Sequence, residues 1–450
     1  MAGHSLQPHL VMADADGNIY DDPRLLMVCR RGGQWGPPRP DELMPLPKES
    51  EFFLLPGRLA VGLDPDTGRL ARPEGEAHLA VAAFAAPAHT ISAHPAYETR
   101  PGAPLLPLFA YGAVGFAQGR FHVCARKVDN EPRQEFRHVP KEAIAAGARD
   151  LRRRYPRNRL VAHILDNCVA RYDCPAARNF ALGRYEAPLP TSRTCNARCV
   201  GCISAQEKGS PVHVTPQCRL AFTPTPEEVA EVMRIHAQRE SRPIYSFGQG
   251  CEGDPLMNAA LLAESVRLFR AQGGPGTVNC NSNASRPDAV AAVAKAGLTS
   301  LRVSLNSARD DLYARYHRPE GYGLEDVRDS IREARRLGIW VSLNLLYFPG
   351  ITDTEEELSA LARLVGENGV SMIQWRNLNI DPEWYFSLMG GQAESGGLGL
   401  SPSLGLGRFM KRLKKLCPWL RYGYFNPWLG EKADIAAPMP GTWHPAEPAS

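Results

Sequence analysis

Residues 194–202 read TCNARCVGC and place Cys195, Cys199 and Cys202 in a C-x3-C-x2-C array with no histidine among them. Closely spaced thiols can bind zinc, bind an iron–sulfur cluster, form disulfides or lie buried without a ligand. Each alternative predicts a different kind of protein, so the sequence on both sides of the array has to distinguish them.

The composition of the chain is that of a folded protein. Its 450 residues are enough for two or three domains, and 44% of them are hydrophobic and 22% charged. The net charge of +4 is too small to indicate a nucleic-acid partner without a local basic patch. The run ARDLRRRYPRNR at 148–159 is such a candidate, but a solvated helix end is the favoured interpretation.

Targeting and membrane signals are missing from the expected places. The opening MAGHSLQPHLVMADADG has no basic region followed by an apolar one, so we expect no secretory signal. The most apolar stretch, residues 103–117, is shorter than the roughly 20 residues that span a bilayer. The sequence therefore predicts a cytoplasmic protein that is not in the membrane. In a reducing compartment, clustered cysteines favour metal binding or catalysis over disulfides.

Short apolar runs alternate with amphipathic helical patterns after residue 185. Strands are expected at 186–194, 243–250, 276–283, 300–307, 340–350 and 371–379. Helices are expected between them, at 225–240, 258–274, 286–297, 323–338 and 354–369. Short βαβ connections force parallel strands, so the sequence predicts an α/β fold with a partial (βα)6 TIM-like barrel. The cysteine array follows the first strand, at the edge where such folds bind ligands.

The rest of the chain divides by composition. Turn signals between short apolar runs predict a β-rich N-terminal domain at 1–100, followed by a connecting region at 101–185. The barrel is expected at 186–390. A glycine-rich linker and a basic C-terminal extension make up 391–450.

The number of thiols in the array bears on its ligand. A structural zinc site usually has four protein ligands, and Cys218 or His213 is available as the fourth. A four-iron cluster held by three thiolates instead leaves one iron open to an outside ligand. An open iron at the mouth of a barrel is a catalytic arrangement.

The cysteine array after a first strand, with βα repeats behind it, resembles the radical S-adenosylmethionine (SAM) enzymes over roughly residues 186–380. The resemblance identifies no subfamily. It implies that Cys195, Cys199 and Cys202 ligate a [4Fe-4S] cluster at which SAM is reductively cleaved to a 5′-deoxyadenosyl radical, which then abstracts a hydrogen from the substrate. It also implies an electron donor such as flavodoxin or ferredoxin. No catalytic residue is assigned beyond the cluster, and a small metabolite, a peptide and RNA all stay open as the substrate.

Further residues resemble the family's SAM-binding positions. The segment Gly250–Cys251–Glu252 looks like the Gly-Gly-Glu segment that binds the SAM amino group, and Glu252 could otherwise be a surface carboxylate. One position departs from the family, because Gly201 stands where an aromatic residue often precedes the third cysteine. Polar pairs that could meet SAM, or form a satisfied polar core, are Asn281 with Asn283 and Ser304 with Asn306.

The substrate would meet SAM inside the barrel. Arg376 is the favoured contact for a carboxylate or phosphate, because arginine offers a bidentate fork, but an ion pair with Asp381 or Glu383 is an equal alternative. All candidate substrate contacts lie on the expected strands and are Arg302, Asn344, Tyr347, Gln374 and Arg376.

Other cysteines leave two further hypotheses open. Cys168 and Cys174 could bind an auxiliary iron–sulfur cluster together with Cys218, Cys251, Cys280 or Cys417. The rival from another class is a non-catalytic metal-binding protein with a structural zinc or iron–sulfur site. That rival leaves the polar residues at the strand ends unexplained.

Overall fold

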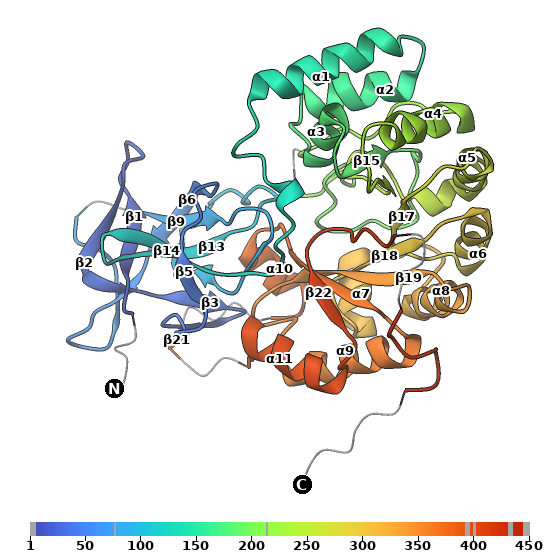
Figure 1. Cartoon of the computed structure of the whole chain (residues 1–450). Coiled ribbons are helices and arrows are strands. Elements are labelled where there is room, and N and C mark those ends of the chain that lie inside the picture. Colours follow the sequence, from blue (N-terminus) through green and yellow to red (C-terminus); the bar gives the residue numbers. More distant parts are fainter. Residues whose placement is uncertain are drawn as a thin grey trace.

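The computed structural model describes residues 6–75, 78–212, 215–391, 397–398, 402–430 and 435–443. The N-terminal strands, blue in Figure 1, lie beside a parallel sheet with helices around it. Within the described residues, no helix is both long enough and apolar enough to cross a membrane.

The N-terminal part is built from antiparallel strands in two sheets. Its larger sheet includes two strands from the region 101–185, β13 and β14. The smaller sheet contains β3, β4, β11 and the later strand β21 (Gly397–Leu398). The strands are β1 His9–Ala13, β2 Ile19–Met27, β3 Cys29–Arg31, β4 Gln34–Gly36, β5 Leu43–Pro45, β6 Glu51–Ala60, β7 Gly62–Leu63, β8 Leu70–Ala71, β9 Leu79–Phe84, β10 His89–Ile91, β11 His94–Pro95, β12 Tyr97–Thr99, β13 Gly112–Ala117 and β14 Arg120–Lys127.

A helical segment connects these strands to the parallel sheet and packs against helix α4, as Figure 1 shows. After a 3-10 turn at Pro132–Gln134 come α1 (Lys141–Arg154), α2 (Arg159–Ala162), a π-helical segment labelled η2 (His163–Val169) and α3 (Pro175–Leu182). The arginine-rich run falls on α1 and α2, where Arg153 and Arg154 pair with Asp150 at exposed positions.

The second part is a parallel sheet that does not close on itself in the described part of the chain, which confirms the predicted partial barrel. Its strands run in sequence order, with the seventh contributed by the C-terminal extension and not predicted from the sequence. They are β15 Glu186–Leu189, β16 Ile244–Phe247, β17 Thr277–Ser282, β18 Ser300–Leu305, β19 Trp340–Tyr347, β20 Met372–Asn377 and β22 Arg421–Gly423.

Helices cover the outer face of this sheet. Local sequence signals define the helix ends: Thr225 and Glu228 form a capping box on α4, and Gly297 and Gly369 end α6 and α9 in the left-handed conformation. The helices are α4 Pro226–Ala237, α5 Ala259–Ala271, α6 Pro287–Ala296, α7 Asp310–His317, α8 Leu324–Arg336, α9 Glu355–Asn368, α10 Pro382–Leu388 and α11 Leu406–Leu416, with a 3-10 turn at Pro255–Asn258.

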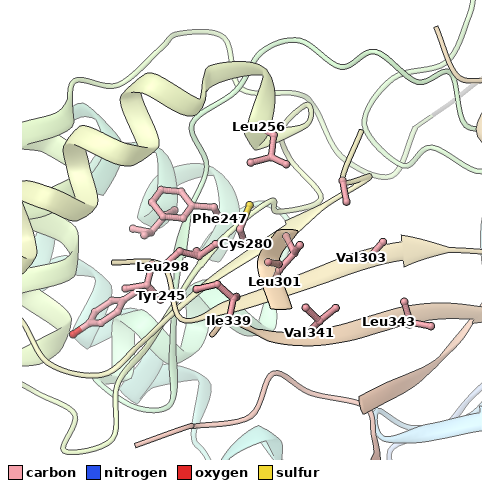
Figure 2. Packing of buried hydrophobic residues seen from close by; sticks show 14 of the residues in the cluster. Tyr245, Phe247, Leu256, Cys280, Leu298, Leu301, Val303, Ile339, Val341 and Leu343 are labelled. Atoms are coloured by element: carbon pink, nitrogen blue, oxygen red, sulfur yellow. The ribbon is translucent and has the colours of Figure 1, made fainter. Parts of the chain in front are cut away.

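Side chains along each strand point alternately into the hydrophobic core and into the barrel interior. Leu301 and Val303 of β18 pack with Val341 and Leu343 of β19 in the buried cluster seen in Figure 2. Residues of the alternate parity, such as Arg302 and Ser304, therefore face the other side of the sheet. This alternation brings the polar residues of neighbouring strands into one space.

The C-terminal extension adds a helix and the last strand of the parallel sheet. Residues 392–396 and 399–401, which belong to the predicted linker, lie outside the described residues. Helix α11 then packs beside α9, with Phe409 6.0 Å from the ring of Trp375 on β20. The chain returns as β22, which pairs in parallel with β20. The extension thus acts as a further αβ unit of the sheet.

The two parts contact each other through β10, β20 and α10. Asn377 at the end of β20 accepts a hydrogen bond from Ile91 N at 2.8 Å. Asp381, at the start of α10, pairs with Arg58 at 2.8 Å, and both side chains are almost fully buried. The predicted domain boundary at residue 100 stays a prediction. The strands of the N-terminal part run on to Lys127.

Candidate functional site

The cysteine array lies in the loop after β15, between two cavities. Cys195, Cys199 and Cys202 line an outer cavity of about 660 Å³ together with surface residues such as Lys208. The same three residues line an inner cavity of about 430 Å³, which reaches along the carboxyl ends of the strands to Ser304. The three thiols therefore stand where the surface and the barrel interior meet.

Helix α7, which the sequence analysis did not predict, supports this loop. The backbone N–H groups of Arg198 and Val200 donate to the carbonyls of His317 and Tyr316 at 3.0 and 2.9 Å. Nδ1 of His317 lies 3.4 Å from Sγ of Cys199. Helix α7 has only eight residues, so its hydrophobic periodicity in the sequence is weak. Its role in supporting the cysteine loop is visible only from its contacts with that loop.

Tyr316 also explains the glycine in the cysteine array. A Cβ atom added at Gly201 would lie 2.9 Å from the phenolic oxygen of Tyr316. Tyr316 lines the inner cavity beside the cysteines. An aromatic ring thus stands next to the array, although it comes from α7 and not from the residue before the third cysteine.

The thiols influence one another electrostatically. Burial, and then the charge of Asp254, raise the pKa of Cys195 to about 11. Burial and the charges of Cys202 and Cys195 raise the pKa of Cys199 well above its usual value. Thiols of this kind become thiolates when a cationic centre compensates their charge.

The donor set fits a cluster with one open position. Among the described residues that line the two cavities there is no fourth cysteine. Of the fourth ligands considered for zinc, Cys218 is exposed and lines neither cavity, and His213 lies outside the described residues. Three cysteines at the mouth of a cavity are the ligand set that a [4Fe-4S] cluster with one free iron requires.

Glu252 lies beside the array but is engaged by the backbone. Its Oε1 accepts hydrogen bonds from the N–H groups of Gly248 and Gln249 at 2.7 and 2.8 Å. Its Oε2 accepts from Thr191 and Ser192 at 2.7 and 2.8 Å. Burial raises the pKa of Glu252 to about 7, while these four donors lower it. The carboxylate therefore ties the loop after β16 to the loop after β15, and its predicted contact with SAM stays a prediction.

The other two residues of that segment face opposite sides. Gly250 lines the inner cavity, where a Cβ would lie 2.7 Å from Oε1 of Gln217. The buried side chain of Cys251 lies outside both cavities, with its Sγ 3.8 Å from Sγ of Cys168. Cys251 as a whole lines neither cavity, and its carbonyl accepts a hydrogen bond from the N–H of Leu220 at 2.7 Å.

Of the four residues in the two predicted polar pairs, three line the inner cavity and one does not. Asn281, Asn283 and Ser304 line the inner cavity. Nδ2 of Asn281 donates to the carbonyl of Gly248 at 3.0 Å, and Nδ2 of Asn283 donates to Oδ1 of Asn196, in the cysteine loop, at 2.9 Å. Asn306 lies outside this cavity, is fully buried and donates to the carbonyl of Leu312 in α7 at 3.0 Å.

Three of the five candidate substrate residues, Arg302, Asn344 and Arg376, line the inner cavity. Gln374 lies behind them and accepts a hydrogen bond from Nη1 of Arg302 at 3.1 Å. Tyr347 is elsewhere, because its hydroxyl donates to Asp353 at 2.7 Å on the helix side of the sheet. The structure therefore brings two arginines and one amide together with the cysteines.

Comparison with known proteins agrees with this geometry. Residues 189–362 match the family model described as Radical SAM superfamily. A probable GTP 3′,8-cyclase of Thermococcus kodakarensis is 31% identical over 171 residues, which cover 37% of this chain and 49% of that protein. The chain thus spans about half the length of this relative. The domain at residues 189–362 belongs to the radical SAM superfamily, and members of this superfamily bind a [4Fe-4S] cluster and SAM.

The solved structures that match the chain are distant from it in sequence. The [FeFe]-hydrogenase maturase HydG is 16% identical, with a TM-score of 0.33 over 56% of this chain and 60% of that chain. Streptococcus suis SuiB bound to S-adenosylmethionine is 14% identical, with a TM-score of 0.31 over 42% and 39% of the two chains.

Proposed function

We propose that the protein is a radical SAM enzyme in which Cys195, Cys199 and Cys202 hold the [4Fe-4S] cluster. The observation that carries this proposal is the position of the three thiols, which line one cavity with the polar ends of the parallel strands. When bound, the cluster and SAM supply one-electron chemistry that removes a hydrogen atom from the substrate. The protein itself supplies binding, orientation and exclusion of water.

Residues around the cavity have separate tasks in this proposal. Glu252 holds the loop after β16 in place, so that the backbone of Gly248–Gly250 lines the cavity. The ring of Tyr316 offers a flat apolar surface for the adenine of SAM. Asn283 connects the third strand of the barrel to the cysteine loop through Asn196.

The two arginines of the inner cavity indicate the charge of the substrate. Arg302 and Arg376 have no acidic side chain within 4.0 Å among the described residues, although both line the cavity. The acids considered as partners of Arg376 are taken, since Asp381 pairs with Arg58 and Glu383 with Arg30 at 2.8 and 2.9 Å.

The electrostatics of this pair favour an anionic ligand. Burial, and then the charge of Arg376, lower the pKa of Arg302 to about 10. Both side chains are only partly exposed, and the charge of Glu186 offsets part of the repulsion at Arg302. A carboxylate or phosphate in the cavity would relieve the remaining repulsion between the two guanidinium groups. We therefore infer that the substrate carries a carboxylate or phosphate group, whether it is a metabolite, a peptide or RNA.

The proposed activity is tested by anaerobic reconstitution with iron and sulfide, followed by addition of dithionite and SAM. We expect the wild type to form 5′-deoxyadenosine and Cys199→Ala to form none. Cys218→Ala is the matched control, because Cys218 is exposed and lines neither cavity, and it should keep wild-type activity. Product formation by Cys199→Ala, or an iron cluster whose EPR spectrum ignores SAM, would contradict the proposal. Zinc bound in place of iron at the three cysteines would support the non-catalytic alternative.

The anionic substrate is tested with inorganic phosphate as the probe, by isothermal titration of the reconstituted protein. We expect Arg376→Met to weaken phosphate binding by about tenfold or more, since a hydrogen bond to a charged group contributes about 1.5–3 kcal/mol. Arg363→Met, at an exposed position of α9, is the control. Equal phosphate affinity in wild type and Arg376→Met would rule out the arginine pair as the anion site.

Electron delivery belongs to the same proposal, whereas an auxiliary cluster does not. A reductant such as flavodoxin or ferredoxin would approach the outer cavity, where the cysteine loop meets the surface. Of the cysteines considered for an auxiliary cluster, Cys168 and Cys251 lie together. Cys280 lies within the barrel core, and Sγ of Cys417 faces the carbonyl of Ala362. We do not include an auxiliary cluster in the proposed function, because the gathered pair suits a single ion better.

A further inference from the structure

A second group of metal-ligating side chains lies behind the loop that follows β16. The side chains of Cys168 and Cys251 are 3% and 5% exposed, and their Sγ atoms are 3.8 Å apart. His163 joins them, since the ligand atoms of the three residues all lie within 4.8 Å of one another. None of the three lines either cavity at the cysteine loop, so this group is separate from the proposed cluster site.

The helix that carries two of these residues is wound in a way that brings them together. In an α-helix each residue turns by about 100°, so positions i and i+5 point about 140° apart. Segment η2 is π-helical instead, and the N–H of Ala170 donates to the carbonyl of Leu165, five residues earlier, at 3.1 Å. This wider winding places His163 and Cys168 on one side of the helix, facing Cys251. Single π-helical turns are rare and occur frequently at functional sites.

The geometry of the group matches a tetrahedral zinc site. With Zn–S bonds of about 2.3 Å, a tetrahedral angle separates two sulfur ligands by about 3.8 Å. The Sγ atoms of Cys168 and Cys251 have this separation, whereas a disulfide requires about 2.05 Å. Nε2 of His163 is buried and makes no hydrogen bond within the described residues. One nitrogen of the imidazole thus has no partner within the described residues, and the ring offers a ligand nitrogen within 4.8 Å of both sulfur atoms.

We propose that His163, Cys168 and Cys251 bind a zinc ion. Two thiolates and one imidazole are ligands that zinc favours. The fourth position is left to water or to Cys174, whose N–H donates to the carbonyl of Cys168 at 2.9 Å. The ion joins the helical segment of residues 141–182 to the loop between Gly250 and Glu252. That this loop also binds SAM rests on the proposed function, whereas zinc binding itself does not.

The test uses the full chain with Cys195, Cys199 and Cys202 all replaced by alanine, so that the array cannot take up metal. We expect this variant to bind one equivalent of Zn²⁺ by mass spectrometry and competition with a chromophoric chelator. Co²⁺ should give thiolate charge-transfer bands and tetrahedral ligand-field bands. Adding Cys168→Ser should weaken zinc binding at least about 100-fold, since even outer-shell partners of a metal cost about 10- to 100-fold. Adding Cys124→Ser is the matched control, because Cys124 belongs to another buried thiol pair, 3.5 Å from Cys29.

Several outcomes would overturn the proposal. They are the absence of bound zinc and of a cobalt spectrum in the triple-alanine variant, zinc affinity that Cys168→Ser leaves unchanged, or a Cys168–Cys251 disulfide found by mass spectrometry in place of metal. His163→Gln provides a second test if the serine variant does not fold, since it should also remove the tetrahedral cobalt bands. These readouts do not depend on SAM cleavage, so a failure here is distinguishable from a failure of the proposed function.

Discussion

Beside the cysteine array, an aromatic residue from a distant helix takes the place of the aromatic residue that the motif itself lacks. Gly201 leaves room for the hydroxyl end of Tyr316, which belongs to a helix more than one hundred residues later in the chain. The ring packs in the same cluster as Val200 and edge-on to Tyr385. The position is rigid, because α7 is bonded to the cysteine loop at two backbone positions. A rigid aromatic surface beside the array is suited to stacking on a purine.

The first prediction is at the scale of this residue. Tyr316→Ala should weaken the binding of SAM to the reconstituted protein by about tenfold, since stacking on an aromatic side chain is worth roughly 1–3 kcal/mol per base. Tyr316→Phe keeps the ring and should bind SAM as the wild type does. Equilibrium dialysis with labelled SAM measures both. If the alanine variant retains wild-type affinity, adenine is held elsewhere in the cavity.

At the scale of elements, buried carboxylates connect the loops at the carboxyl ends of the strands to neighbouring elements. Glu252 ties the loops after β15 and β16 together. Glu357, in the first turn of α9, accepts a 2.5 Å hydrogen bond from Ser307 and a 2.7 Å bond from the N–H of Ala308, both after β18. These bonds position the start of the segment that leads into α7. The supports of the cysteine loop thus extend to α9.

The second prediction concerns Glu357 and pH. Burial raises its pKa from 4.5 to about 7, so the native state binds the proton more tightly than the unfolded chain does. This contribution to stability is complete below pH 4.5 and is lost as the pH rises through 7. When the pH is raised from 5 to 8, the unfolding free energy of Glu357→Gln should therefore rise by up to about 3 kcal/mol relative to that of the wild type. Urea denaturation at both pH values measures this difference.

The neighbour of Glu357 supplies the control for that measurement. Glu356 lies on the same turn of α9 but is exposed, so Glu356→Gln should leave the pH dependence of stability nearly unchanged. A Glu357→Gln variant that loses stability relative to wild type between pH 5 and pH 8 would show that the carboxylate is stabilised in its charged form.

At the scale of the whole molecule, the N-terminal sheets and the barrel are held together by buried polar contacts. The Arg58–Asp381 pair is 4% and 1% exposed. Asp381 also accepts a hydrogen bond from Leu106 N at 3.0 Å, and it caps α10 by accepting one from Glu383 N at 2.9 Å. One carboxylate thus serves both parts of the molecule, and we expect the two parts to unfold together.

The third prediction follows from this pair. Asp381→Ala should destabilise the protein by about 3–5 kcal/mol, because it leaves a buried guanidinium without its counter-charge. Differential scanning calorimetry should show one transition for the wild type and a lower melting temperature for the variant. Asp66→Ala, at an exposed turn of the N-terminal part, serves as the control. Two separate transitions in the wild type would contradict the coupling of the two parts.

Much of the barrel could be predicted because its signals are local. The predicted strand 340–350 and helix 354–369 differ from β19 and α9 only at their ends, since periodicity and capping residues act over a few positions. Strand β22 and helix α7 were not predicted. Each is short, and β22 exists because its backbone completes the edge of β20. Such elements depend on a partner that is distant in sequence.

The sequence by itself determined the three-cysteine array and its place at the carboxyl ends of parallel strands, because spacing and strand order are properties of the continuous chain. Only the tertiary structure decided how the side chains are used. It saturates Glu252 with backbone donors, turns Cys251 towards Cys168, and leaves Arg302 and Arg376 without an acidic side chain within 4.0 Å among the described residues. The physical reason is that hydrogen bonding, burial and charge pairing depend on which distant segments come into contact, and a local sequence pattern does not specify those contacts.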